Sequence, residues 1–141
     1  MFKNLTIAIT MLFAATTANA TTIEMLNKDA DGNKMVYSQE IARVAAGDTI
    51  TWVPTSKGHN VEIVAAPEGF DIPKKSKNGK EVAITFDVPG VYYYWCTPHK
   101  GMGMIGLVVV GDDTSNAEAI EIGRAHVRTP VTEKSRMPSS A

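Results

Sequence analysis

Four side chains with strong metal-binding chemistry occur in two short segments of the sequence. Cys96, His99 and Met104 follow one another closely, and His59 stands far upstream of them. Two imidazoles, one thiolate and one thioether are the donors of a blue copper site, in which the histidines and the cysteine are equatorial and the methionine is a long, weak axial ligand. The spacing Cys-x₂-His-x₄-Met with an upstream histidine therefore predicts one copper ion.

The donor types also indicate what such an ion would do. Sulfur donors are soft and favour Cu(I), whereas imidazoles keep Cu(II) acceptable, so both oxidation states stay bound. Three donors on one loop set the local geometry, and a fourth from a distant strand makes the site depend on the fold. Ligands that hardly move when an electron arrives suit fast one-electron transfer, which is the function that we predict.

Taken singly, these residues have ordinary structural interpretations. A lone cysteine is most often a small buried hydrophobe, and methionines usually fill cores. The chain has one cysteine, which excludes an internal disulfide, a four-cysteine zinc site and an iron–sulfur cluster. An unpaired thiol is a liability in an oxidising compartment unless something occupies it, so the combination favours metal ligation.

Both ends of the chain are predicted to lie outside the mature domain. Residues 1–20 have a basic start, an apolar stretch and a small-x-small cleavage pattern at 18–20, which is typical of an export signal. Residues 122–141 have no hydrophobic period and resemble the translation of a common sequencing-adapter oligonucleotide. We predict a non-native tail, with a genuine disordered tail as the alternative. The mature domain is then 21–121, and its predicted location is the periplasm.

The strands and turns that must position the donors are predicted to form one all-β domain. Short apolar or alternating runs recur about every ten residues between Gly, Pro, Asn and Asp, which is typical of a sandwich or barrel. The range 64–79 is predicted to be a connection with room for one short helical turn, and 116–120 to begin a helix. The predicted strands are 23–27, 35–38, 41–44, 49–53, 61–63, 82–86, 91–96 and 105–110.

Size and charge exclude several other classes of protein. The chain has 141 residues, which leaves no room for a two-domain enzyme, and its net charge of −1 gives no argument for nucleic acid binding. Residues 21–121 carry nine cationic and fourteen acidic side chains, so the domain itself is more acidic, at −5. After residue 20 no segment is long and apolar enough to cross a membrane. We expect a soluble monomer.

Three motifs carry a resemblance to a known family. The chain reads Cys-Thr-Pro-His at 96–99, Met-Gly-Met-Ile-Gly at 102–106 and Gly-His-Asn-Val-Glu at 58–62. It resembles the cupredoxins, and within them most closely the pseudoazurins, from about residue 23 to the C-terminal helical region.

This resemblance implies an eight-stranded Greek-key β-sandwich with one type-1 copper ion, bound by His59, Cys96, His99 and Met104. Met102 is the competing axial candidate, but the family spacing selects Met104. The family ends in two packed helices, of which this chain lacks the second and much of the first.

Three further residues are predicted to support the ligands. Asn60 follows His59 and is expected to hydrogen-bond to the loop carrying Cys96, with a plain turn residue as the alternative. Pro98 has no N–H and so cannot donate to the thiolate sulfur. The resemblance places Met35 where the family often has a methionine packed near the exposed histidine.

The surface around His99 is predicted to receive redox partners. One imidazole edge is expected to reach solvent through a small apolar patch that includes Met102. A lysine ring around such a patch suits brief docking to an acidic partner, although a charge run is more often a solvated face. The resemblance implies a copper nitrite reductase as acceptor and a c-type cytochrome as donor. The predicted docking lysines are Lys28, Lys57, Lys77 and Lys100.

Three classes of function compete for this site. Four protein ligands leave no open coordination position for a substrate, so a copper enzyme is not expected. A periplasmic copper store or chaperone usually needs an exposed site rich in methionine and histidine, and the seven methionines keep this class as the alternative. The sequence favours a one-electron carrier.

Overall fold

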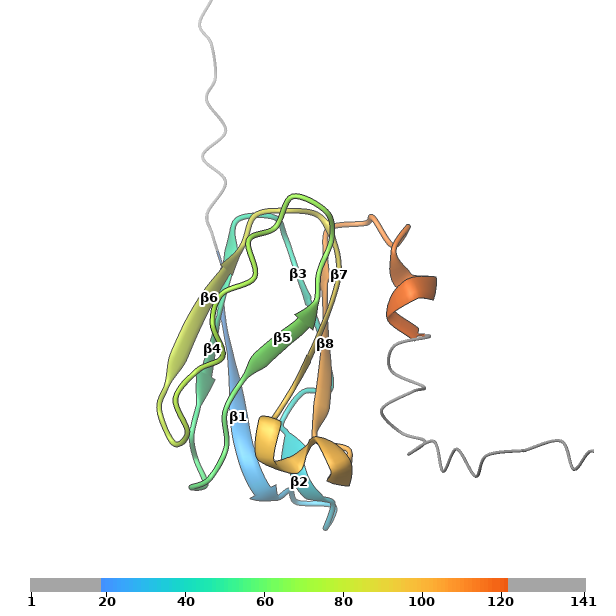
Figure 1. Cartoon of the computed structure of the whole chain (residues 1–141). Helices are drawn as coiled ribbons and strands as arrows, with labels where there is room; N and C mark the ends of the chain where they lie inside the picture. Colours follow the sequence, from blue (N-terminus) through green and yellow to red (C-terminus); the bar gives the residue numbers. More distant parts are fainter. Residues whose placement is uncertain (1–18, 122–141) are drawn as a thin grey trace, which may run out of the picture.

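The described part of the chain contains eight β-strands, one short 3-10 helix and a helical turn at its C-terminal end (Figure 1). The computed structural model describes residues 19–121, so the predicted tail and all but the last two residues of the predicted signal lie outside it. The elements are β1 (Ala20–Lys28), β2 (Lys34–Tyr37), β3 (Ile41–Val44), β4 (Asp48–Val53), β5 (Glu62–Ala65), β6 (Val82–Phe86), β7 (Gly90–Trp95), the 3-10 helix η1 (Thr97–Met102) and β8 (Ile105–Val110).

The strands form two four-stranded sheets that pack face to face. Their orders are β2-β1-β4-β6 and β3-β8-β7-β5. β1 runs parallel to β4 and β3 runs parallel to β8, whereas the other neighbours are antiparallel. Each sheet is therefore mixed, and strands far apart in the sequence lie side by side. The predicted all-β sandwich of eight strands is confirmed.

Several aromatic side chains pack together between the two sheets. Trp52, Tyr94 and Phe86 are fully buried, and Trp52 meets Tyr94 edge-to-face with ring centroids 5.2 Å apart. Rings in this arrangement stabilise each other beyond the area that they bury. Gly106 of β8 is needed beside Tyr94, because a Cβ atom there would collide with the tyrosine ring. This packing fixes the ends of β7 and β8, between which the ligand loop lies.

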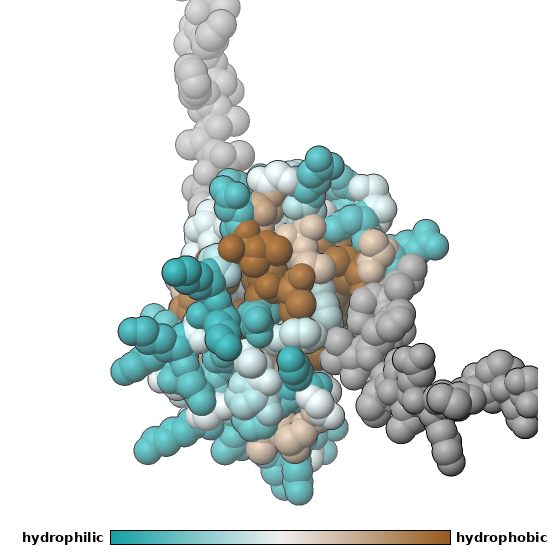
Figure 2. All heavy atoms as spheres, viewed as in Figure 1, coloured by the Kyte–Doolittle hydropathy of each residue, from teal (hydrophilic) through white to brown (hydrophobic). Residues whose placement is uncertain are grey.

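A second apolar cluster lies on the outer face of the β3-β8-β7-β5 sheet. It contains Val91, Tyr93, Ile105, Leu107 and Val109, and Ile120 packs against them. Residues 117–121 are helical, which confirms the helix predicted near residue 116. In Figure 2 apolar side chains gather in the upper half of the visible face, while hydrophilic residues dominate its lower half.

The structure corrects two predictions about the chain between β5 and β6. β5 begins and ends later than predicted, at Glu62 and Ala65, with a register irregularity between Ile63 and Ala65. In addition, the range 66–79 contains no helical residue, so the prediction of a short helical turn there was wrong. Two prolines in this range limit helix formation, which explains the second difference. Within residues 19–121 no helix has the length and apolar character needed to span a membrane.

Candidate metal centre

The segments that carry the four predicted ligands come together at one end of the sandwich, the lower end in Figure 1. His59 lies in the connection from β4 to β5. Cys96 follows β7 and is the N-cap residue of η1, His99 lies within η1, and Met104 directly precedes β8. Two segments that are distant in the sequence therefore converge, as the spacing of the donors predicts.

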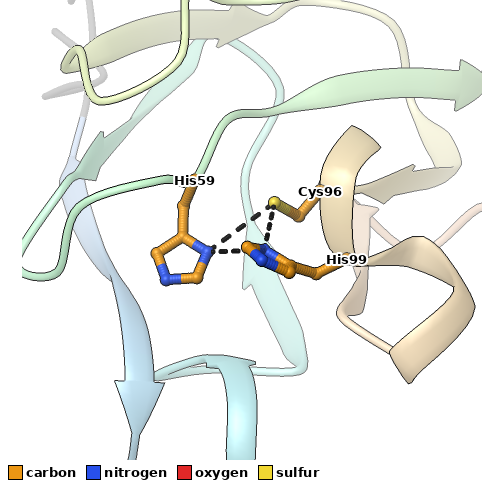
Figure 3. A group of neighbouring side chains, drawn as sticks. All are labelled: His59, Cys96 and His99. Carbon is orange, nitrogen blue, oxygen red and sulfur yellow. Dashed lines mark hydrogen bonds between the residues drawn. The ribbon is translucent and has the colours of Figure 1, made fainter.

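The side chains of His59, Cys96 and His99 point toward one another (Figure 3). The two histidine Nδ1 atoms are 3.1 Å apart, and Cys96 Sγ lies 3.4 Å from that of His99 and 3.7 Å from that of His59. A point equidistant from the three atoms lies about 2.0 Å from each, close to the ~2.0–2.3 Å over which zinc binds nitrogen and sulfur. The three donors thus fit one transition-metal ion.

Burial separates the two candidate methionines. Met104 is fully buried in the main core together with Cys96, whereas Met102 is 60% exposed. The backbone holds Met104 close to the other donors: the Cys96 N–H donates to the Met104 carbonyl at 3.0 Å, and the Met104 N–H donates to the His99 carbonyl at 3.3 Å. His99 is half-buried, so the imidazole is partly open to solvent.

The electrostatics of the donors suit a cation. Burial lowers the pKa of His59, and nearby His99 lowers it further, so His59 is held in the neutral form that a metal requires. Burial raises the pKa of the Cys96 thiol, and hydrogen bonds from the backbone N–H groups of Asn60 and His99 offset this only in part. A bound metal ion supplies the positive charge that deprotonates such a thiol.

Asn27, at the end of β1, orients His59. Its Oδ1 lies 2.7 Å from His59 Nε2, and an amide oxygen can only accept, so Nε2 carries the proton. The lone pair of His59 Nδ1 then faces the other two donors. Asn27 could not be identified from the sequence, because the parallel pairing of β1 with β4 brings it beside His59 and no local pattern reveals that pairing.

Asn60 ties the two converging segments together. Thr97 N–H donates to Asn60 Oδ1 at 2.8 Å, and Asn60 Nδ2 donates to Thr97 Oγ1 at 3.1 Å. Tyr37 O–H also donates to the Asn60 carbonyl at 2.7 Å. The predicted hydrogen bond between Asn60 and the loop carrying Cys96 is therefore present.

The other predicted supporting residues are placed as follows. Pro98 lies in the first turn of η1 with an exposed side chain, and Met35 in β2 is half-buried against the main core. Met35 has φ of +52°, a left-handed conformation that non-glycine residues rarely adopt. The predicted place of Met35 near His99 stays a prediction.

The predicted docking residues all lie at the surface. The side chains of Lys28, Lys57, Lys77 and Lys100 are exposed, as is that of Met102. Lys100 Nζ lies 4.6 Å from the centroid of the Trp95 ring, within the range of a cation–π contact. Their role in docking remains a prediction.

Comparison with known proteins identifies the family. Residues 23–111 match the copper binding proteins of the plastocyanin/azurin family. The chain belongs to this family.

Pseudoazurins are among its most similar relatives. The chain is 41% identical to the pseudoazurin of Methylorubrum extorquens over 126 residues, which cover 84% of each chain, and 43% identical to that of Paracoccus pantotrophus, with 72% of this chain and 70% of that one covered. Solved structures agree: the pseudoazurin of Hyphomicrobium denitrificans matches with a TM-score of 0.68 and 43% identity, over 73% of this chain and 83% of that one.

Family membership and geometry together define the class of protein. The fold is the cupredoxin sandwich and the cofactor is copper, as the sequence predicts. The chain is a pseudoazurin-like blue copper electron carrier rather than an enzyme.

Proposed function

We propose that this protein carries single electrons between redox proteins of the periplasm, with one type-1 copper ion held by His59, Cys96, His99 and Met104. A copper nitrite reductase is the proposed acceptor and a c-type cytochrome the proposed donor. The observation that carries the proposal is the convergence of two Nδ1 atoms and one Sγ atom within 3.7 Å of one another. Bound copper supplies a one-electron Cu(II)/Cu(I) couple.

The residues of the chain account for the two properties that a carrier needs. Asn27 holds the His59 imidazole and Asn60 joins the two converging segments by hydrogen bonds, so the donors change little between oxidation states. Burial of His59, Cys96 and Met104 keeps water and small ligands away from the ion. Half-buried His99 leaves one imidazole edge through which an electron can pass to a docked partner.

The metal site is tested by adding Cu(II) to the purified protein and recording its visible spectrum. An intense blue band, which reports a thiolate-to-copper transition, is expected, together with its loss in Cys96→Ser. Met104→Ala should keep a band but shift it, because the equatorial donors remain, whereas Met102→Ala should leave the spectrum unchanged. A colourless complex, or a wild-type spectrum in Cys96→Ser, would refute the ligand assignment.

The docking proposal is tested by the salt dependence of electron transfer to a copper nitrite reductase. Exposed lysines that steer an acidic partner should make the rate fall as ionic strength rises. Lys57→Glu and Lys100→Glu should slow the reaction at low salt, whereas Arg43→Glu, an equal charge change on β3, should have a smaller effect. Rates that respond to neither salt nor these variants would remove the docking proposal.

A further inference from the structure

One carboxylate from a neighbouring strand holds both residues that flank Cys96. Glu62 Oε2 accepts a hydrogen bond of 2.7 Å from Trp95 Nε1 and another of 2.8 Å from Thr97 Oγ1. Glu62 and Trp95 are also paired directly across the β5–β7 ladder, so their side chains lie on the same face of the sheet. Cys96 therefore lies between two residues that are attached to a single oxygen atom.

The Thr97 hydroxyl extends this attachment to the segment that carries His59. A hydroxyl has one proton and two lone pairs. The proton is donated to Glu62, and the oxygen accepts from Asn60 Nδ2 at 3.1 Å. Hydrogen bonds thus run from Glu62 through Thr97 to Asn60, which adjoins His59 in the chain.

An ionised Glu62 is the stronger acceptor for both bonds, and its surroundings favour that form. Hydrogen bonds from Trp95 and Thr97 lower its pKa, burial opposes them, and Lys75 and Lys100 lower it further. Lys100 also lies over the Trp95 ring whose N–H Glu62 holds. Hydrogen bonds to a carboxylate are roughly twice as strong as those between neutral groups, so both tethers are of the stronger kind.

We infer that Glu62 is a positioning residue for the Cys96 ligand, an inference that rests on the proposed copper function. Its carboxylate fixes the backbone on both sides of the cysteine through Trp95 and Thr97, and thereby sets the direction from which the thiolate meets the metal. Glu62 acts through the two residues that it holds, Trp95 and Thr97.

A graded pair of substitutions tests this inference. Glu62→Gln keeps one acceptor oxygen but loses the charge, and Glu62→Ala loses both tethers. In the copper-loaded protein the thiolate-to-copper band and its electron paramagnetic resonance should shift slightly in Glu62→Gln and further in Glu62→Ala. Glu68→Gln is the matched control, because Glu68 is an exposed acid in the connection after β5. Its neighbour Pro67 packs against Gly90 at the start of β7, which is the end of that strand away from Cys96.

A second readout needs no metal. In the copper-free protein the Trp95 indole N–H should exchange with solvent about tenfold faster or more in Glu62→Ala, since a charge-assisted hydrogen bond is lost. Thr97→Val removes the second tether, together with the bond that Asn60 Nδ2 donates to the same hydroxyl. The double variant with Glu62→Ala should shift the copper band by less than the sum of the two single shifts, because both changes delete the same bond.

The outcomes separate this inference from the proposed function. Wild-type copper spectra in both Glu62 variants would overturn it, even if indole exchange were faster, because the tether would then be structural only. Wild-type indole exchange in Glu62→Ala would overturn it as well. If the wild-type protein formed no blue complex, the proposed function would fail, whatever the exchange measurement showed.

Discussion

Replacing Asn60 by alanine tests whether the two converging segments depend on one side chain. Asn60 is 5% exposed and makes two good hydrogen bonds to Thr97, at 2.8 and 3.1 Å, and a longer one of 3.4 Å to the Ser76 carbonyl. Each good bond contributes about 1 kcal/mol, and leaving the half-buried Thr97 N–H without a partner costs about 1 kcal/mol more. We therefore expect Asn60→Ala to lose about 2–4 kcal/mol of unfolding free energy.

For a domain of this size such a loss lowers the melting temperature by about 10–20 °C. Far-ultraviolet circular dichroism of the copper-free protein measures this directly, without a contribution from metal binding. Asn60→Asp keeps the oxygen that accepts from Thr97 N–H and should lose less. Asn78→Ala is the matched control, because Asn78 is an exposed asparagine in the connection before β6.

The reasoning is refuted if Asn60→Ala melts within about 3 °C of the wild type, since that shift corresponds to less than one hydrogen bond. It is also refuted if Asn60→Ala and Asn78→Ala lower the melting temperature equally. The loss would then come from removing any asparagine side chain rather than from untying the two segments.

Three further predictions concern the rest of the site and the far sheet face. Asn27→Ala frees His59 Nε2 and should weaken copper binding about 10–100-fold in a chelator competition, and unchanged affinity would show that Asn27 does not orient the imidazole. Because the folded-state pKa of Glu62 is lowered, its stabilising effect is complete above about pH 4.5 and is lost as the pH falls through the folded value. Urea unfolding at a series of acidic pH values should therefore give a flatter profile for Glu62→Gln than for the wild type, and parallel profiles would contradict this. Ile120→Ala should lose about 2–4 kcal/mol in the same assay, because Ile120 is 4% exposed against the outer apolar cluster, and a loss below about 0.5 kcal/mol would mean that the helix barely stabilises that face.

The sequence predicted the strands and the donor types well, because both follow from local patterns. The alternation of β4, for example, is visible in its own residues, where Ile50 and Trp52 face inward. The spacing from Cys96 to Met104 likewise belongs to one short loop. The alternation of apolar residues and the spacing of donors are properties of a few neighbouring residues, so a single sequence is enough to reveal them.

The supporting contacts could be predicted only where a ligand lay next to them. Asn60 adjoins His59 and was identified, whereas Asn27 and Glu62 reach the site through strand pairing. The bulge in β5 has the same origin, because its register is set against β7 and not within β5. Pairing is a relation between distant segments, and one sequence without its fold does not reveal which segments meet.

The course of β1 has a practical consequence for attaching the protein to a surface. Its nine residues run from Ala20, at the end of the sandwich away from the donors, to Lys28 at the end that holds them. With a rise of 3.3 Å per residue, the eight steps of the strand place its start roughly 26 Å from the donor end. An electrode linker joined at the Ala20 end would therefore point the exposed edge of His99 into solution, where a dissolved partner can reach it.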